Sequence, residues 1–239
     1  MVMPANELRA VKIKRKFTRS SPGSVLYQSG ETIVLCTASI ESNVPAWLVG
    51  SGKGWVTAEY NMLPHSTNQR KRRDRDGKTD GRTTEIQRLI GRSLRAIIDL
   101  TMLGERMVTV DCDVIQADGG TRTASITGGF LALADALYPE FRRATPSEHP
   151  LRDSVAAVSV GIVNGKPCLD LDYELDSAAA VDMNVVMTGS GRFVEIQGTG
   201  EEATFDDSQL ASMLKLARAG IQQLTQLQID ALGKQWPCA

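Results

Sequence analysis

The feature that most constrains the fold is an alternating segment that leads through a glycine turn into a run of small residues. Apolar and polar residues alternate from Val108 to Val114 within the segment 107–115, which is typical of a strand with one buried face. The chain then passes through Ala117-Asp118-Gly119-Gly120-Thr121-Arg122 into a helix that we expect near Ile126–Leu137. A strand and a helix joined this tightly favour a sheet with helices packed against it.

The remaining segments supply more strands and two further helices. Three pairs of β-rich segments flank short turns and predict hairpins, at 24–28 with 32–40, 155–163 with 168–173, and 181–188 with 192–197. Apolar residues at helical spacing predict helices over Glu85–Leu100 and Leu210–Leu224, while three prolines make Tyr138–Pro150 a predicted linker. Strand pairs followed by long helices indicate an α+β or mixed α/β sandwich.

Composition excludes several classes of protein. With 42% hydrophobic and 23% charged residues the chain is typical of soluble globular proteins, and its formal charge of −1 leaves nucleic-acid binding to local patches. No apolar run approaches the ~20 residues that span a membrane, so we expect no membrane association and a cytoplasmic protein. Four cysteines without a C-x-x-C pair and only two histidines argue against zinc sites and disulfides; Cys36 and Cys112 should be buried thiols.

The glycine turn has the composition of a phosphate cradle. Glycines let the backbone approach a ligand, and a helix N-terminus offers unpaired N–H groups with a partial positive charge. Thr121 adds a hydroxyl and Arg122 a planar, bidentate donor. The alternative is a plain tight turn with a capping Thr or Ser.

Basic residues form two local groups. Arg88, Arg92 and Arg95 share one face of the predicted helix, where they could bind a phosphate backbone, lie in solvent or pair with carboxylates of another subunit. The segment Arg70–Arg82 has seven basic and three acidic residues and no apolar ones, which predicts an exposed, mobile loop.

An acidic segment, Asp170–Asp182, follows the second hairpin. Asp170 and Asp172 alternate there with Leu169 and Leu171, and Asp176 and Asp182 follow, six residues apart. Nearby carboxylates of this kind could hold Mg²⁺, which takes one or two carboxylates and leaves positions for water and substrate phosphate, or one of them could act as a general acid. The alternative is a solvent-facing acidic edge, and Asp111 and Asp113 compete for the same role. A phosphate cradle, a basic stripe and a carboxylate pair are the parts that phosphoryl chemistry requires, but their spacing alone does not separate phosphoryl transfer from RNA binding.

At these residues the chain resembles the bacterial ribonuclease PH family. The similarity runs from about Glu7 to the C-terminal helix, and two motifs, EIQRLIGR and QADGGTRTASITG, are highly specific to that family. The matching stretches are GSVLYQSGETIVLCTASIE, GKGWVTAEYNMLP, GRTTEIQRLIGRSLRAIIDL, DCDVIQADGGTRTASITG, DLDYELDSAAAVDMNVVMT and VEIQGTGE.

The resemblance implies a phosphorolytic 3′→5′ exoribonuclease. Inorganic phosphate would attack the last phosphodiester of an RNA, such as a tRNA precursor, and release a nucleoside diphosphate in a reversible reaction. By match to the family motifs, the phosphate ligands would be Arg82, Gly120, Thr121 and Arg122. Asp176 and Asp182 would be the catalytic carboxylates and hold Mg²⁺, with Mn²⁺ as the alternative.

The resemblance also implies an assembly and an RNA surface. A single domain over residues 1–239 would form a ring-shaped homo-hexamer, a trimer of dimers. Arg70 and Arg73 match basic positions of a loop that would hold the tRNA body, and the RNA-binding set would include Arg88, Arg92 and Arg95. His65 stands where a family arginine is usual, and the segment 1–5 lacks the family's arginine-containing opening.

Two other functions stay open at this stage. One is a non-catalytic, RNA-binding ring subunit of an exosome-like assembly, although such relatives typically lose the phosphate arginines or the aspartates that this chain keeps. The other is a two-metal hydrolytic nuclease, which would need a denser carboxylate cluster and no phosphate-binding Thr-Arg turn.

Overall fold

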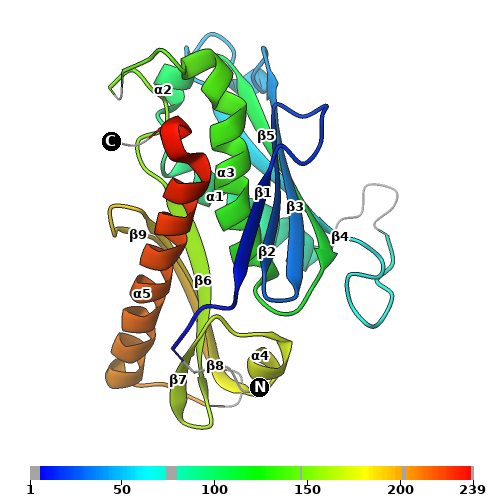
Figure 1. Cartoon of the computed structure of the whole chain (residues 1–239), viewed down its shortest axis with the longest axis vertical. Helices are drawn as coiled ribbons and strands as arrows, with labels where there is room; N and C mark the ends of the chain where they lie inside the picture. The colour runs from blue at the N-terminus through cyan, green and yellow to red at the C-terminus, as the bar shows by residue number, and fades with distance from the viewer. Residues whose placement is uncertain (1–5, 74–79, 146, 201–202, 238–239) are drawn as a thin grey trace.

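The computed structural model describes residues 6–73, 80–145, 147–200 and 203–237. They form two β-sheets and five α-helices, with 3-10 turns at Ala46–Leu48 and Gly233–Gln235 (Figure 1). The first sheet has the order β1-β2-β3-β5-β4 and is antiparallel except between β4 and β5. Its strands are β1 (Val11–Arg15), β2 (Gly23–Ser29), β3 (Thr32–Glu41), β4 (Trp55–Met62) and β5 (Met107–Gln116).

The second sheet is antiparallel throughout and has the order β7-β6-β8-β9. Its strands are β6 (Val155–Val163), β7 (Lys166–Leu169), β8 (Ala179–Thr188) and β9 (Phe193–Gly200). All three predicted hairpins are therefore present. The prediction that the middle one extends to Tyr173 was wrong, because Asp170 turns into the left-handed region at φ 54° and the short helix α4 (Tyr173–Ser177) follows.

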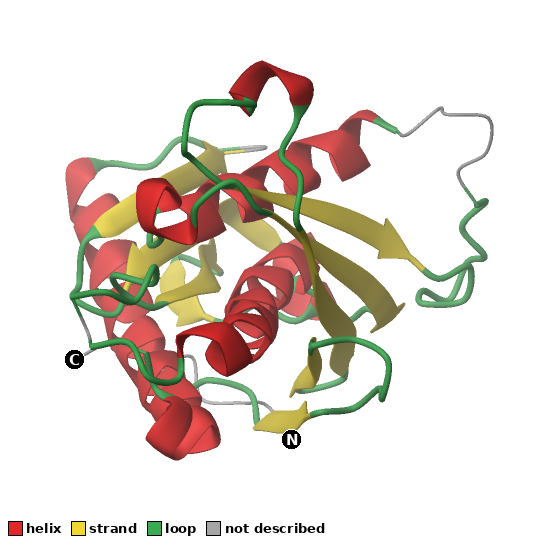
Figure 2. Cartoon of the chain, turned by 90° about the horizontal axis from the view of Figure 1, so that it is seen from above, coloured by secondary structure: helices red, strands yellow, loops and turns green. Residues whose placement is uncertain are grey.

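Helix α3 (Thr121–Phe141) is the centre of the fold, and every residue from Thr123 to Leu137 is buried. It contacts β2 and β3 on one side and β6 on the other, and Figure 2 shows it in the space between two groups of strands. Glycines on both sides permit this close packing: a Cβ at Gly23 of β2 would lie 1.9 Å from the carbonyl oxygen of Ala132, and a Cβ at Gly128 of α3 would lie 2.9 Å from Sγ of Cys36 in β3. The helix therefore holds the two sheets at a fixed spacing.

The outer helices cover one sheet each. Helix α1 (Gly81–Arg95) lies beside α3 on β4 and buries Ile86, Leu89, Ile90 and Leu94, the predicted apolar stripe. Helix α5 (Asp207–Leu232) covers β6, β7 and β8 (Figure 1). The result is the predicted mixed α/β sandwich.

Two helix boundaries differ from the predictions. Helix α1 ends at Arg95 rather than Leu100, because Ile97 and Ile98 bond to the segment 151–152 and a new helix, α2 (Leu100–Leu103), begins after Asp99. The predicted linker starts too early, since α3 runs through Pro139 to Phe141. Within the described parts of the chain no helix is long and apolar enough to cross a membrane, and Cys36 and Cys112 are buried free thiols as predicted.

Candidate active site

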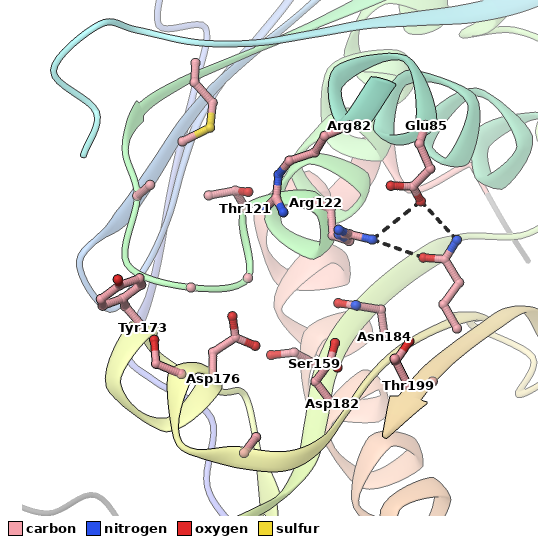
Figure 3. A pocket seen from close by; sticks show the side chains of 18 of the residues that line it. Arg82, Glu85, Thr121, Arg122, Ser159, Tyr173, Asp176, Asp182, Asn184 and Thr199 are labelled. Atoms are coloured by element: carbon pink, nitrogen blue, oxygen red, sulfur yellow. Dashed lines mark hydrogen bonds and ion pairs between the residues drawn. The ribbon is translucent and has the colours of Figure 1, made fainter. Parts of the chain in front are cut away.

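A cavity of about 950 Å³ lies where the two sheets approach each other. The N-terminal turns of α1 and α3 form one wall, and β8, β9 and α4 form the other (Figure 3). The first wall presents the guanidinium groups of Arg82 and Arg122, the Thr121 hydroxyl and the Glu85 carboxylate, and the second wall includes two further carboxylates. The polar side chains that line the cavity include those of Arg82, Glu85, Thr121, Arg122, Asp176, Asp182, Asn184 and Gln197.

The glycine turn enters the cavity from α3. Gly119 and Gly120 both have positive φ, 71° and 63°, and Gly120 is the N-cap residue of the helix. A Cβ at Gly119 would lie 2.5 Å from the carbonyl oxygen of Leu171, so only glycine lets this turn approach the chain before α4. Thr121 then opens a 21-residue helix, and its first turn presents N–H groups without intrahelical acceptors at the cavity.

A buried ion pair supports the glycine turn. Arg9 Nη2 lies 2.7 Å from Asp170 Oδ1, both side chains are more than nine-tenths buried, and Arg9 also donates to the carbonyl oxygen of Asp118. Burial alone would lower the pKa of Arg9, but the hydrogen bond and charge of Asp170 raise it. The Thr32 hydroxyl contacts the same turn twice. It donates to the carbonyl oxygen of Gly119 at 2.7 Å and accepts from the backbone N–H of Asp118 at 2.9 Å.

The Thr121 hydroxyl has a fixed partner in the first sheet. It lies 2.8 Å from the hydroxyl of Tyr60, and both residues are buried. Burial raises the pKa of the Tyr60 phenol, while the bond to Thr121 and the charges of Arg82 and Arg122 act in the opposite direction. Both arginines are therefore close enough to act electrostatically on the same buried group.

Arg82 reaches the cavity from the first turn of α1, although the sequence predicted it at the end of a loop. Asp80 caps the helix and accepts from the Thr83 N–H at 2.5 Å. This backbone bond is the main reason why the pKa of Asp80 is lowered to about 2. The cap starts the helix ahead of its predicted boundary and thereby places Arg82 opposite α3.

The two predicted catalytic carboxylates line the opposite wall. Asp176 belongs to α4 and Asp182 to β8, and Figure 3 shows them facing the side from which Arg82 and Arg122 enter. Asn184 also lines the cavity, two residues beyond Asp182 and thus on the same face of β8. The cavity thus places two carboxylates on one wall opposite two guanidinium groups on the other, an arrangement that can bind an anion beside the guanidinium groups.

The other candidate carboxylates have different surroundings. Asp170 is paired with Arg9, and Asp172 is the N-cap of α4, where it accepts from the Leu175 N–H at 2.8 Å. Asp111 and Asp113 line a separate cavity of about 250 Å³ with Glu59. Burial raises the pKa of both, and the charge of Asp113 adds to the effect on Asp111. None of these four aspartates lines the cavity that contains Asp176 and Asp182; Asp170 instead supports the glycine turn through Arg9.

The predicted RNA-binding arginines fall into two groups. Arg70, Arg73 and Arg88 are exposed; residues 74–79 of the basic segment lie outside the described residues. Arg92 forms a two-nitrogen ion pair with Glu195 of β9 at 2.8–3.0 Å, and Arg95 stacks on Trp55 at 4.4 Å from its ring centroid while donating to Val56. Their RNA-binding role stays a prediction.

Two family models match most of the chain. The model of the 3′ exoribonuclease family, domain 1, matches residues 7–139, and that of domain 2 matches residues 153–220. The chain belongs to the 3′ exoribonuclease family. It is 66% identical over 230 residues to the ribonuclease PH of Rhodopirellula baltica, a match that covers 94% of each chain.

Solved structures share the fold of this 3′ exoribonuclease family member at lower identity. Rice Rrp46 matches with a TM-score of 0.78 at 17% identity, covering 96% of this chain and 97% of its own. A structure described as the Archaeoglobus fulgidus exosome with RNA bound to the active site matches with a TM-score of 0.78 at 20% identity, covering 94% and 90%. The boundary between the two family regions falls between residues 139 and 153, from the last turn of α3 to the start of β6, and the cavity is built from both regions. One domain over 1–239 stays a prediction.

Sequence reasoning missed four residues that line or support this cavity. Asn184 could have been predicted from the sequence, because a polar residue two positions beyond Asp182 on a strand lies on the same face. Gln197 and Glu85 lie in the matched motifs but have no charge pattern that singles them out. Arg9 carried no signal, because its partner Asp170 is 161 positions away.

Proposed function

We propose that this chain is a phosphate-dependent 3′→5′ exoribonuclease that removes single nucleotides from RNA 3′ ends as nucleoside diphosphates. One observation carries the proposal: a single cavity has the glycine turn, Arg82 and Arg122 on one wall and Asp176 and Asp182 on the other. A hydrolytic nuclease has no need of a second anion site beside its scissile phosphate. A phosphorolytic enzyme must hold two anions next to each other.

The chemistry follows from that need. An oxygen of inorganic phosphate forms a bond to the phosphorus of the last phosphodiester, while the bond from that phosphorus to the preceding 3′ oxygen breaks. The two arginines and the N-terminus of α3 neutralise the attacking phosphate, which lets it approach an anionic diester. The departing 3′ oxygen takes up a proton, and an aspartate on the opposite wall is placed to assist as general acid. Because a phosphoryl bond is exchanged for another, the reaction is reversible.

The donor set on the second wall suits a hard divalent cation. Asp176 and Asp182 supply two carboxylates, and the described residues hold no group of three or more His, Cys, Asp and Glu side chains that would form a complete metal cage. Mg²⁺ is usually bound by one or two carboxylates plus substrate phosphates and water, and Mn²⁺ accepts the same ligands. The cation, when bound, stabilises negative charge that develops on the transferred phosphoryl group.

The proposed RNA partner is a tRNA precursor with extra 3′ nucleotides. Exposed Arg70, Arg73 and Arg88 would contact its phosphates outside the cavity. We also propose the ring-shaped homo-hexamer, a trimer of dimers, in the cytoplasm. Equilibrium sedimentation of the purified chain tests the assembly, because a hexamer has six times the 25.9 kDa of the chain.

The deciding experiment follows a tRNA with extra 3′ nucleotides in Mg²⁺, with and without inorganic phosphate. We expect nucleoside diphosphates only when phosphate is present, and extension of the RNA when diphosphates are added instead. Asp182→Asn and Arg122→Ala should each reduce the rate by at least about 100-fold. Full phosphate-dependent activity in either variant would refute the assigned roles.

The same experiment separates the alternatives. Monophosphates released without phosphate would establish hydrolysis and overturn the mechanism. RNA binding without any product would favour the non-catalytic ring subunit.

A further inference from the structure

One of the two cavity arginines is held by side chains from two other elements. Nη1 of Arg122 lies 3.2 Å from Oε1 of Gln197 and 3.5 Å from Oε1 of Glu85. Nε2 of Gln197 in turn donates to the same Glu85 oxygen at 3.1 Å, so the three side chains close a triangle (Figure 3). The amide of Gln197 is thereby oriented with its oxygen toward the guanidinium and its nitrogen toward the carboxylate.

The triangle is tied to the outer face of α1 through a second carboxylate. Nε2 of Gln197 also lies 3.0 Å from Oε1 of Glu195. Both oxygens of Glu195 accept from Arg92 at 2.8–3.0 Å, and the Glu195 side chain is only 19% exposed. Arg92, Glu195, Gln197 and Glu85 thus form a continuous chain of charge-assisted and amide hydrogen bonds that ends at Arg122; we call these four residues the β9 clamp.

The clamp joins the two walls of the cavity. Arg92 and Glu85 belong to α1 and Arg122 to α3, whereas Glu195 and Gln197 belong to β9. Strand β9 pairs directly with β8, where Asn184 lies opposite Gln197 and Asp182 opposite Thr199. A displacement of β9 relative to α1 would therefore move Asp182 relative to the anion-binding arginines.

We propose that the β9 clamp is the positioning device of this site, which holds the Arg122 guanidinium at a fixed place relative to the strand that carries Asp182. The clamp residues act through Arg122 and are positioning residues rather than catalytic ones. Phosphorolysis needs such a device because the attacking phosphate and the scissile diester are bound by opposite walls, and small errors in their separation slow an in-line reaction. The inference rests on the proposed function for its kinetic consequences, but not for its effect on anion binding.

This inference gives Arg92 a different task from RNA contact. Its guanidinium is already engaged by two carboxylate oxygens, and a guanidinium bound in this bidentate way has less capacity for a phosphate. The two roles predict opposite kinetics, which makes Arg92 the residue at which the inference is best tested.

The first measurement compares the KM for inorganic phosphate with the KM for tailed tRNA in Gln197→Leu, Glu85→Gln and Arg92→Ala. We expect the phosphate KM to rise about tenfold in Gln197→Leu, which loses a hydrogen bond to a charged group, and about threefold in Arg92→Ala, while the RNA KM changes less than twofold. Glu85→Gln keeps an acceptor oxygen but removes the charge that faces Arg122, so its phosphate KM should rise, though less than that of Gln197→Leu. Arg152→Ala is the matched control, since it removes a comparable surface pair with Asp99.

The second measurement is a charge swap. A positioning role predicts that Arg92→Glu raises the phosphate KM. Adding Glu195→Arg restores the ion pair between α1 and β9 but not the acceptor for Gln197, so it should lower the phosphate KM again without reaching the wild-type value. An RNA-contact role predicts instead that Arg92→Glu raises the RNA KM and that the second change does not restore it. Either that pattern, or an unchanged phosphate KM in Gln197→Leu, would overturn the inference.

A readout without turnover separates this inference from the proposed function. Inorganic phosphate should raise the melting temperature of the wild type and of Arg152→Ala, and should do so less at equal concentration in Gln197→Leu. If phosphate stabilises the wild type more than Gln197→Leu but the wild type has no phosphorolytic activity, the proposed function is refuted and the positioning role of the β9 clamp is retained. If phosphate protects Gln197→Leu as well as the wild type, the clamp fails whatever the activity.

Discussion

The two supports of the anion site are built in opposite ways. The glycine turn rests on the Arg9–Asp170 pair, whose side chains are 6% and 7% exposed, whereas the clamp ends in Arg92, which is 49% exposed. A buried charge that loses its partner stays without solvation, which costs folding free energy. An exposed charge that loses its partner is hydrated by water, so the cost is small. The turn should therefore be coupled to folding, and the clamp to the precision of the site.

The largest effect should come from Asp170→Ala. It leaves the Arg9 guanidinium buried without its partner, which typically costs about 3–5 kcal/mol, so we expect a melting temperature lower by roughly ten degrees in a chain of this size. Thermal unfolding followed by circular dichroism checks this. Arg92→Ala removes the 49% exposed end of the clamp and should cost less than about 1 kcal/mol; equal losses in the two variants would break the comparison.

The next effect should come from Gly119→Ala. The new Cβ would meet the carbonyl of Leu171 at 2.5 Å in a backbone with positive φ, and a strained residue of this kind costs on the order of 1–3 kcal/mol. Because relaxation moves the turn away from the chain before α4, we also expect at least about tenfold lower phosphorolysis. Gly165→Ala is the control, with a φ of 74° but no atom within 4 Å of the new Cβ. Equal losses of stability in the two variants would mean that strain rather than the contact sets the cost, and wild-type phosphorolysis in Gly119→Ala would refute the role of the turn in the site.

A smaller effect is expected from Tyr60→Phe. The variant removes the 2.8 Å bond to the Thr121 hydroxyl without changing the buried ring, and a hydrogen bond of this kind is worth about 1 kcal/mol. Urea unfolding should show that loss. The released hydroxyl can turn toward the anion, so the phosphate KM should change less than threefold; a loss of activity like that of Arg122→Ala would give Tyr60 a direct role.

The smallest effect should be a gain in stability, in Asp111→Asn. Burial and the charge of Asp113 raise the pKa of Asp111 in the folded state. The unfolded chain then releases its proton first, so ionisation of Asp111 lowers stability as the pH rises from about 4 through the folded-state pKa. Asp111→Asn should therefore be more stable than the wild type at pH 7 and equal to it at pH 3, as measured by urea unfolding. Greater stability at both values would indicate better packing instead of a relieved charge.

Much of the fold was predictable because it depends on local periodicity. The alternation before Val114 and the helical spacing from Ile86 to Leu94 are read along the chain, and both elements are present. The prediction that α1 ends at Leu100 was wrong. Ile97 and Ile98 continue the helical spacing in the sequence, but their backbone bonds to residues 151–152 place them outside the helix.

For the site, the sequence determined by itself the chemical types: a glycine turn before a helix, arginines beside it and carboxylates further along the chain. The sequence left four other aspartates as candidates for the role of Asp176 and Asp182, because residue spacing does not show which way a side chain faces. Only the tertiary structure decided that Asp170 pairs with Arg9 and that Gln197 holds Arg122, across 161 and 75 positions. Such contacts depend on how two sheets pack against α3, and that packing is a property of the whole core rather than of any local pattern.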